Sequence, residues 1–213
     1  MKNPTLTKKT DYRPFIIKSL MAFLLFSTVF FLIKDALPYI RFQVEAYGET
    51  YWSVKWWLAG HILGGSLALL LGLFQFVPAI RNRYLKLHRT LGKVYILSIL
   101  VGSFCALYMA SVISPRINVA WSISLIFLAV PWLVTVLMAY RMIRLRRIQQ
   151  HREWMIRSYV VTFGFVIFRF VENHPFIESI METVGERAPT VGWFCWAVPL
   201  LFTEVVLQWN KKK

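Results

Sequence analysis

The residues of this sequence with the greatest capacity for chemistry are four histidines, His61, His88, His151 and His174. Two of them are followed directly by arginine, since Arg89 follows His88 and Arg152 follows His151. A neutral imidazole is a strong axial ligand for haem iron, and nearby cations can neutralise haem propionates. The pattern therefore suggests a b-type haem held by paired histidines.

The expected membrane topology sorts these histidines into two layers. His88 and His151 fall at the inner face, where Arg89, Arg152 and Arg157 could contact the same cofactor, and the other two fall at the outer face. A hydrocarbon core about 30 Å thick separates the layers, so no single metal ion can take ligands from both. The inner pair is our candidate for the ligands of haem iron.

Each histidine also has a structural interpretation that involves no cofactor. His88 and His151 stand beside arginine at a helix start, as residues that contact lipid headgroups often do. His61 is the main cofactor candidate of the outer layer, but it follows glycine and could equally hydrogen-bond to a neighbouring helix. His174 precedes Pro175 and is typical of a helix cap.

Charged and amide side chains at membrane depth are also candidate site residues, because a charge there costs roughly 2.5–3.5 kcal/mol on insertion scales. Arg157 and Glu204 fall at similar depth, and we expect them to pair as a structural clamp. Arg169 and Glu172, three residues apart on one helix, should pair as well. Gln75 should hydrogen-bond across helices near the inner end.

Composition places these groups in a membrane. Of the 213 residues, 57% are hydrophobic and only 16% are charged, which is too apolar for a soluble domain. We predict an all-α protein, a single polytopic membrane helix bundle over residues 1–213 with six transmembrane helices. The expected spans are about 14–33, 57–80, 91–112, 119–140, 154–171 and 191–209.

The charge pattern predicts the orientation of the bundle. Basic residues fill both termini, the loop 81–93 and the stretch 141–157, and loops rich in lysine and arginine stay in the cytoplasm. Most acidic residues gather instead in 34–56 and 172–186. We therefore expect both termini in the cytoplasm, an uncleaved first span and the lipid bilayer as the main partner.

Local patterns predict how the spans pack. Pro131 lies in the middle of the fourth span and should kink it. Short surface helices are expected within 34–56 and over 175–184. A flat face for a neighbouring helix or a planar ligand is expected on the second span, at Gly60, Gly64, Gly65, Ala68 and Gly72.

Several functions lack support in the sequence. The net charge of +15 is divided among the loops, so it does not form the basic face that nucleic-acid binding requires. No Walker loop, nucleophile elbow, H-E-x-x-H motif or dinucleotide fingerprint occurs. Cys105 and Cys195 lie within apolar segments and are more typical of packing residues than of a disulfide.

Three motifs together resemble those of a known family. They are H-I-L-G-G-x-x-A-L-L-L-G-x-F-Q-F from His61, H-R-x-L-G-K-V-Y from His88 and H-R-x-W-M-I-R-S-Y from His151, with Arg169 downstream. Over about residues 57–205 the chain is similar to bacterial predicted membrane proteins of the domain of unknown function 2306 (DUF2306) family. The resemblance implies a bacterial inner-membrane location and no established activity. A weaker likeness links the chain to proteins of haem-copper oxidase maturation and to cytochrome b561-type bundles.

Three functional hypotheses follow. The first is a redox or electron-transfer protein with haem b, partnered by a quinone or a respiratory complex. The second is a non-enzymatic small-molecule transporter or assembly factor, with a cavity lined by His61, Gln75, Pro131 and the pair of Arg157 and Glu204. The third is a scaffold in which the polar residues only hold helices together.

Overall fold

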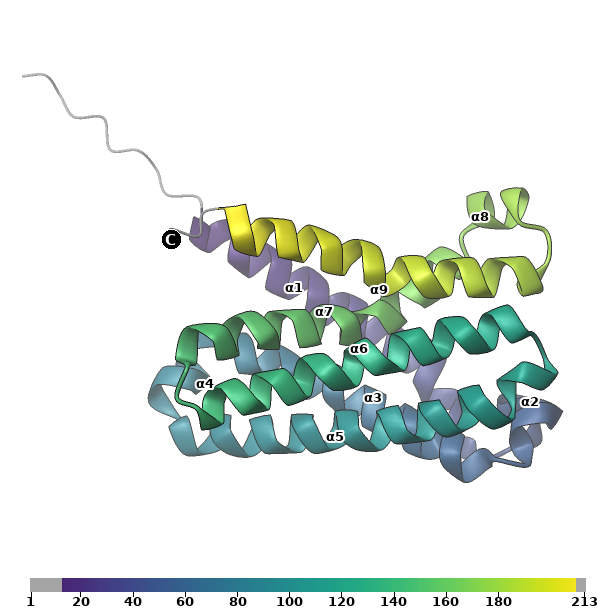
Figure 1. Cartoon of the computed structure of the whole chain (residues 1–213), viewed down its shortest axis with the longest axis horizontal. Coiled ribbons are helices and arrows are strands. Elements are labelled where there is room, and N and C mark those ends of the chain that lie inside the picture. The colour runs from purple at the N-terminus through teal and green to yellow at the C-terminus, as the bar shows by residue number, and fades with distance from the viewer. Residues whose placement is uncertain (1–12, 210–213) are drawn as a thin grey trace, which may run out of the picture.

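Residues 13–209 are described by a computed structural model, and within that range the chain is all-helical with no β-strand, as predicted (Figure 1). The long helices are α1 (Arg13–Phe31), α3 (Lys55–Phe76), α5 (Leu85–Val112), α6 (Val119–Arg144), α7 (Ile148–Glu172) and α9 (Val184–Trp209). The short elements are the π-helix η1 (Leu32–Ala36), the 3₁₀-helices η2 (Leu37–Arg41) and η3 (Ser114–Arg116), and the α-helices α2 (Val44–Trp52), α4 (Pro78–Arg83) and α8 (Pro175–Ile180).

Six helices of the described chain are long and apolar enough to cross a membrane, the first of them continuing through η1 and η2 to Arg41. Each predicted span corresponds to one of these helices. Large apolar side chains face outward from them; Phe23 is 61% exposed and Val206 is 73% exposed. Such a surface is stable against lipid rather than water.

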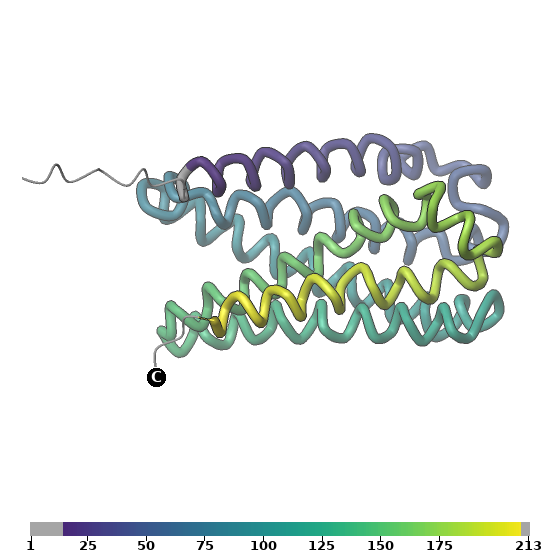
Figure 2. Tube along the Cα trace, turned by 90° about the horizontal axis from the view of Figure 1, so that it is seen from above, coloured from purple at the N-terminus to yellow at the C-terminus, as the bar shows by residue number. Residues whose placement is uncertain are grey.

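The bundle has two ends of different charge. The beginning of α1 and the end of α9 lie at the same end as α4 and the turn between α6 and α7, whereas α2 and α8 lie at the opposite end (Figures 1 and 2). We name these the α4 end and the α2 end. The basic loops 81–93 and 141–152 belong to the α4 end, and the acidic segments 45–49 and 172–186 belong to the α2 end.

Close approach of α3 and α5 gives the most extensive helix contact in the bundle. Gly64 permits it, because a Cβ atom there would lie only 2.6 Å from the carbonyl oxygen of Ser98. Of the small residues predicted to form a flat face, Gly60 and Gly64 therefore serve a neighbouring helix, whereas a Cβ atom at Gly65 would meet nothing within 4 Å. Helix α7 packs between α6 and α9, and α1 makes lighter contacts with α3 and α7.

Hydrogen-bonded side chains hold the centre of the bundle. The hydroxyl groups of Tyr95 and Ser158 lie 2.9 Å apart, and the indole Nε1 of Trp132 donates to the Thr162 hydroxyl at 2.9 Å. The rings of Tyr95 and Trp132 are fully buried. Because a buried polar group without a partner is costly, this network fixes how α5, α6 and α7 meet.

The turn between α6 and α7 is a Schellman motif. The N–H of Arg147 donates to the Met142 carbonyl at 2.9 Å and that of Arg146 to the Ile143 carbonyl at 3.0 Å. Arg146 takes the left-handed position with φ of 59°, where glycine is usual. The motif turns the chain sharply, so His151 lies in the first turn of α7, next to the end of α6.

Some predicted helix ends were wrong. The second span ends at Phe76 rather than at residue 80, because Val77 is extended ahead of Pro78. The third span begins at Leu85 and the fifth at Ile148, both earlier than predicted, because basic side chains continue these helices past the apolar region. The first span continues beyond residue 33 through η1.

Other local predictions were confirmed. Short helices form at Val44–Trp52 and Pro175–Ile180, although the second stops before residue 184. The N-cap of α8 is His174, whose Nδ1 accepts from the backbone N–H of Phe176 at 3.3 Å. Cys105 and Cys195 are free, and Cys195 lies in the core. Helix α6 continues through Pro131, and the kink predicted there stays a prediction.

Candidate functional site

A cavity of about 320 Å³ lies toward the α2 end, among α3, α5, α6 and α7, with η1 and α2 over it. This volume falls within the range of small-molecule sites, roughly 300–1,000 Å³. Most of the lining is apolar or aromatic. Its polar members include Asp35, Ser66 and Arg169, together with His61.

Aromatic rings form the wall on the side of α6 and α7. The rings of Trp132 and Phe165 meet edge to face with centroids 5.1 Å apart, and those of Trp121 and Phe168 meet at 5.4 Å. On α3, Gly65 leaves open space, since a Cβ atom there would meet no atom within 4 Å. A flat ring therefore finds a matching surface on one side and room on the other.

His61 is held by the neighbouring helix in one tautomer. Its Nδ1 lies 3.0 Å from the carbonyl oxygen of Gly102, and a carbonyl can only accept, so Nδ1 donates. The ring packs edge to face against Trp132 and Phe165, at 6.1 and 5.4 Å between centroids. The predicted inter-helix hydrogen bond is confirmed. In the neutral ring, Nε2 is left as an acceptor, and it has no hydrogen-bond partner among residues 13–209.

An ion cluster closes the end of the cavity nearest α2. Arg169 Nη1 lies 3.3 Å from Glu172 Oε2, which confirms the predicted pair, and its Nε lies 4.0 Å from Asp35 Oδ1. Asp35 was not singled out from the sequence, because the first span was expected to end before it. The π-turn of η1 brings it to the cavity instead, and π-turns often occur at functional sites.

Tyrosines of η2 and α2 cover the same region. Tyr47 is buried, and its hydroxyl donates to the carbonyl of Tyr39 at 3.1 Å. Burial, and secondarily the neighbouring Tyr39, raises the pKa of the Tyr47 phenol above its ordinary value. The phenol therefore remains a neutral hydrogen-bond donor across the usual pH range.

At the α4 end, His88 lies in the first turn of α5 and His151 lies in the first turn of α7. His151 Nδ1 donates to the Ala139 carbonyl at 2.8 Å, which leaves Nε2 as the free nitrogen of the neutral ring. His88 Nδ1 is buried and has no hydrogen-bond partner among the described residues. Arg89 and Arg152, which follow them in the chain, are exposed, and the shared site predicted for the two imidazoles stays a prediction.

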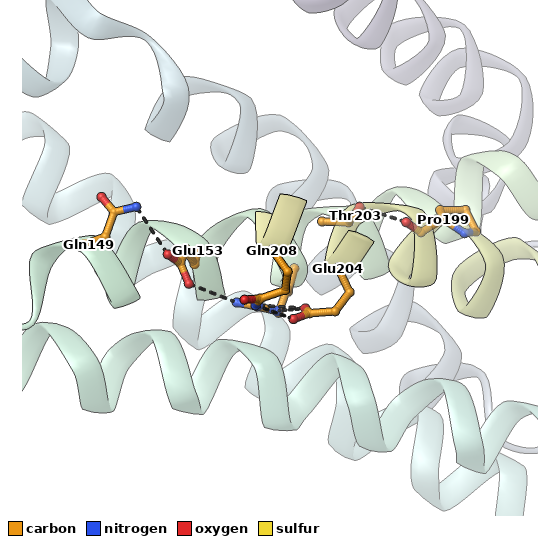
Figure 3. A network of polar contacts seen from close by, with 7 residues as sticks. Gln149, Glu153, Pro199, Thr203, Glu204 and Gln208 are labelled. Carbon is orange, nitrogen blue, oxygen red and sulfur yellow. Dashed lines mark hydrogen bonds and ion pairs between the residues drawn. The ribbon is translucent and has the colours of Figure 1, made fainter. Parts of the chain in front are cut away.

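Arg157 is paired with carboxylates, as predicted. Its Nη2 and Nε lie 2.7 and 2.8 Å from Glu204 Oε2, and its Nη1 lies 4.0 Å from Glu153 Oε2. Gln208 also donates to Glu204, at 2.7 Å (Figure 3). The expectation that Arg157 contacts a haem propionate is not supported by this arrangement, because the guanidinium is already occupied by carboxylates.

Gln75 does not make the expected hydrogen bond. Its side chain is buried and its Nε2 has no partner in the described part of the chain. The amide instead packs on Gly92, where a Cβ atom would lie 3.2 Å from Oε1.

The cavity predicted from the sequence was wrong in part. His61 lines the observed cavity, but Gln75, Pro131 and the pair of Arg157 and Glu204 do not. Gln75 lies 14 residues beyond His61 on α3, about 21 Å along the helix.

No three His, Cys, Asp or Glu side chains gather within residues 13–209 as the ligands of a metal ion. His61 lies near the start of α3, which follows α2 in the chain, and His88 lies near the start of α5, which follows α4, so the two layers of histidines stay a prediction.

Comparison with known proteins places the chain in a family. The family model described as "Predicted membrane protein (DUF2306)" matches residues 58–207, which run from α3 into α9. No curated protein and no solved structure matches the chain. The matched region covers well over half of the 213 residues and includes His61, His88, His151 and Arg169. The chain belongs to the DUF2306 family of predicted membrane proteins.

Proposed function

We propose that this multi-pass membrane protein binds a small, largely apolar organic molecule in the cavity beside His61. The observation that carries the proposal is the aromatic lining of a cavity of about 320 Å³ with few polar groups. Cavities of this kind are the usual ligand sites of helix bundles.

We also propose that the α4 end faces the cytoplasm of a bacterial inner membrane. Its loops hold arginine and lysine at residues 81–93 and 141–152, and such loops are retained on the cytoplasmic side. The cavity then lies in the outer half of the membrane. A molecule dissolved in the outer leaflet would reach it without crossing the bilayer.

Filling the cavity from Gly65 should abolish binding. The variant Gly65→Leu places a side chain where a Cβ atom meets nothing within 4 Å, so the bundle should accept it while the ligand loses its space. We expect saturable binding of the fluorescent probe 1-anilinonaphthalene by the purified protein, and at least a tenfold loss of affinity in the variant, as roughly 1.4 kcal/mol corresponds to tenfold.

A lipid-facing variant of the same helix provides the control. Leu63 is 63% exposed, so Leu63→Phe adds volume outside the cavity and should leave probe binding unchanged. Absence of saturable binding by the unaltered protein, or equal binding by Gly65→Leu and Leu63→Phe, would argue against the cavity as a ligand site.

A second candidate function is haem b binding at the α4 end, as an electron-transfer protein. The observation that favours it is the hydrogen bond from His151 Nδ1 to the Ala139 carbonyl, together with a buried His88 Nδ1 that has no hydrogen-bond partner among the described residues. Histidines that ligate a metal almost always donate their other ring N–H in this way. Exposed Arg89 and Arg152 would be available to haem propionates.

An absorption spectrum tests the haem candidate. Protein purified from haem-replete cells should show a Soret band that is lost in His88→Ala and in His151→Ala. His174→Ala should retain the band, because His174 caps α8 at the α2 end. A spectrum without a Soret band in the unaltered protein would remove this candidate and leave the cavity proposal intact.

A further inference from the structure

We infer that the molecule bound beside His61 carries a hydroxylated aromatic ring, as a membrane-soluble quinol does, with one hydroxyl donating to His61 Nε2 and an opposite oxygen accepting from Arg169. This inference rests on the proposed function of the cavity, because it names the chemical class of the occupant. The inference depends on His61 being able only to accept a hydrogen bond from the ligand, on Arg169 being able only to donate one, and on the aromatic rings that line the same cavity.

His61 requires a donor from the ligand. Its Nδ1 proton is used in the hydrogen bond to the Gly102 carbonyl, so the Nε2 of the neutral ring offers only a lone pair. A hydroxyl group can donate to that lone pair, whereas the carbonyl oxygen of a quinone cannot. Binding a quinone would leave Nε2 unpaired or require a charged imidazolium in apolar surroundings, and both are unfavourable. The reduced, hydroxylated form is therefore preferred.

Arg169 supplies the opposite polarity. A guanidinium has only donors. In Arg169, Nη1 donates to Glu172 at 3.3 Å, but Nε lies 4.0 Å from Asp35, beyond hydrogen-bond distance, and the side chain is 42% exposed. It can therefore donate to a second ligand oxygen. His61 contacts the ring of Phe165, which lies four residues before Arg169 on α7, or about 6 Å along the helix. His61 and Arg169 both line the cavity.

The lining between these two groups favours a ring over other ligands. The rings of Trp132 and Phe165 offer edges and faces to a flat aromatic molecule, and Gly65 leaves room on the other side. A sugar would lose its hydrogen bonds against such walls. An ionised fatty acid could pair with Arg169 but would offer no donor to His61.

Competition against the anilinonaphthalene probe tests the inference with three molecules that share one tail: decylhydroquinone, decylquinone and decylbenzene. Under anaerobic conditions we expect decylhydroquinone to displace the probe at a concentration about tenfold lower than decylquinone, because only the hydroquinone pairs Nε2. Decylbenzene should be the weakest of the three. His61→Phe should remove the preference for hydroquinone over quinone while retaining decylbenzene binding.

His174→Phe is the matched control, because it alters the other histidine of the α2 end outside the cavity and should keep the order of the three molecules. Equal displacement by all three molecules, or tighter binding of the quinone, would overturn the inference and leave the cavity proposal standing. No saturable probe binding in the unaltered protein would overturn both. Should His61→Phe not fold, the order measured on the unaltered protein decides alone.

Discussion

Gly64→Ala is expected to destabilise the bundle strongly, whereas Gly65→Ala is expected to leave it intact or slightly more stable. A Cβ atom at Gly64 would lie 2.6 Å from the Ser98 carbonyl oxygen and 2.9 Å from the Gly102 nitrogen. Both are backbone atoms, so α3 and α5 must separate along their most extensive contact. Overpacking typically costs about 1–3 kcal/mol, and we expect the upper part of that range or more.

At Gly65 the same methyl group enters the cavity and meets nothing within 4 Å. Alanine also favours a helix over glycine by about 1 kcal/mol, so this change should not destabilise the fold. The free energy of unfolding in mixed micelles, followed by circular dichroism, measures both variants against the unaltered protein. Equal stability of the two variants would show that the packing of α3 on α5 has been described wrongly.

Arg157→Leu is the second variant with a large expected effect, a loss of about 3–5 kcal/mol of unfolding free energy. Arg157 is buried and serves both Glu204, at 2.7 Å, and Glu153, at 4.0 Å. Without the Arg157 guanidinium, Glu153 and Glu204 both lose their cationic partner, and Glu153 is itself buried, where an unpaired charge is unfavourable. Glu204→Gln should cost less, because Arg157 keeps Glu153 and an amide oxygen can still accept.

The neighbouring arginine provides the comparison for this variant. Arg152 is exposed at the α4 end and has no ion-pair partner among the described residues, so Arg152→Leu should change stability by less than about 0.5 kcal/mol. The same unfolding measurement applies to both. If Arg157→Leu behaved like Arg152→Leu, the cluster in Figure 3 would be a surface contact rather than a clamp.

Much of the fold could be predicted from the sequence because the bilayer leaves few choices. Long apolar stretches must be helical in lipid, so the number of spans could be predicted from the sequence. Basic loops alternate with acidic ones along the chain, so it could also be predicted that the beginning of α1 and the end of α9 lie at the same end of the bundle. Pairs within one helix, such as Arg169 with Glu172, are also fixed by helical spacing. The pair of Arg157 and Glu204 followed from their similar depth.

The cavity could not be predicted, because it depends on which helices are neighbours and on rotations of single residues. Nothing in the sequence distinguishes Trp132 from the other tryptophans, of which the chain has nine in all. Gly64 and Gly65 are adjacent and identical, yet one packs against α5 and the other faces open space. Asp35 reached the cavity through a π-turn that has no clear sequence signal.

The cavity is lined by residues from two parts of the chain, one inside the region that the family model matches and one before it. His61, Trp132 and Arg169 belong to the region 58–207 that the family model matches. The residues that cover them, Phe31, Asp35, Ala36, Tyr39, Tyr47 and Tyr51, all precede that region. A relative that shares the matched region alone would have the same base under a different cover. Exchanging the first 54 residues between two such proteins should therefore change how the cavity is covered and leave the ligand preference set by His61 in place.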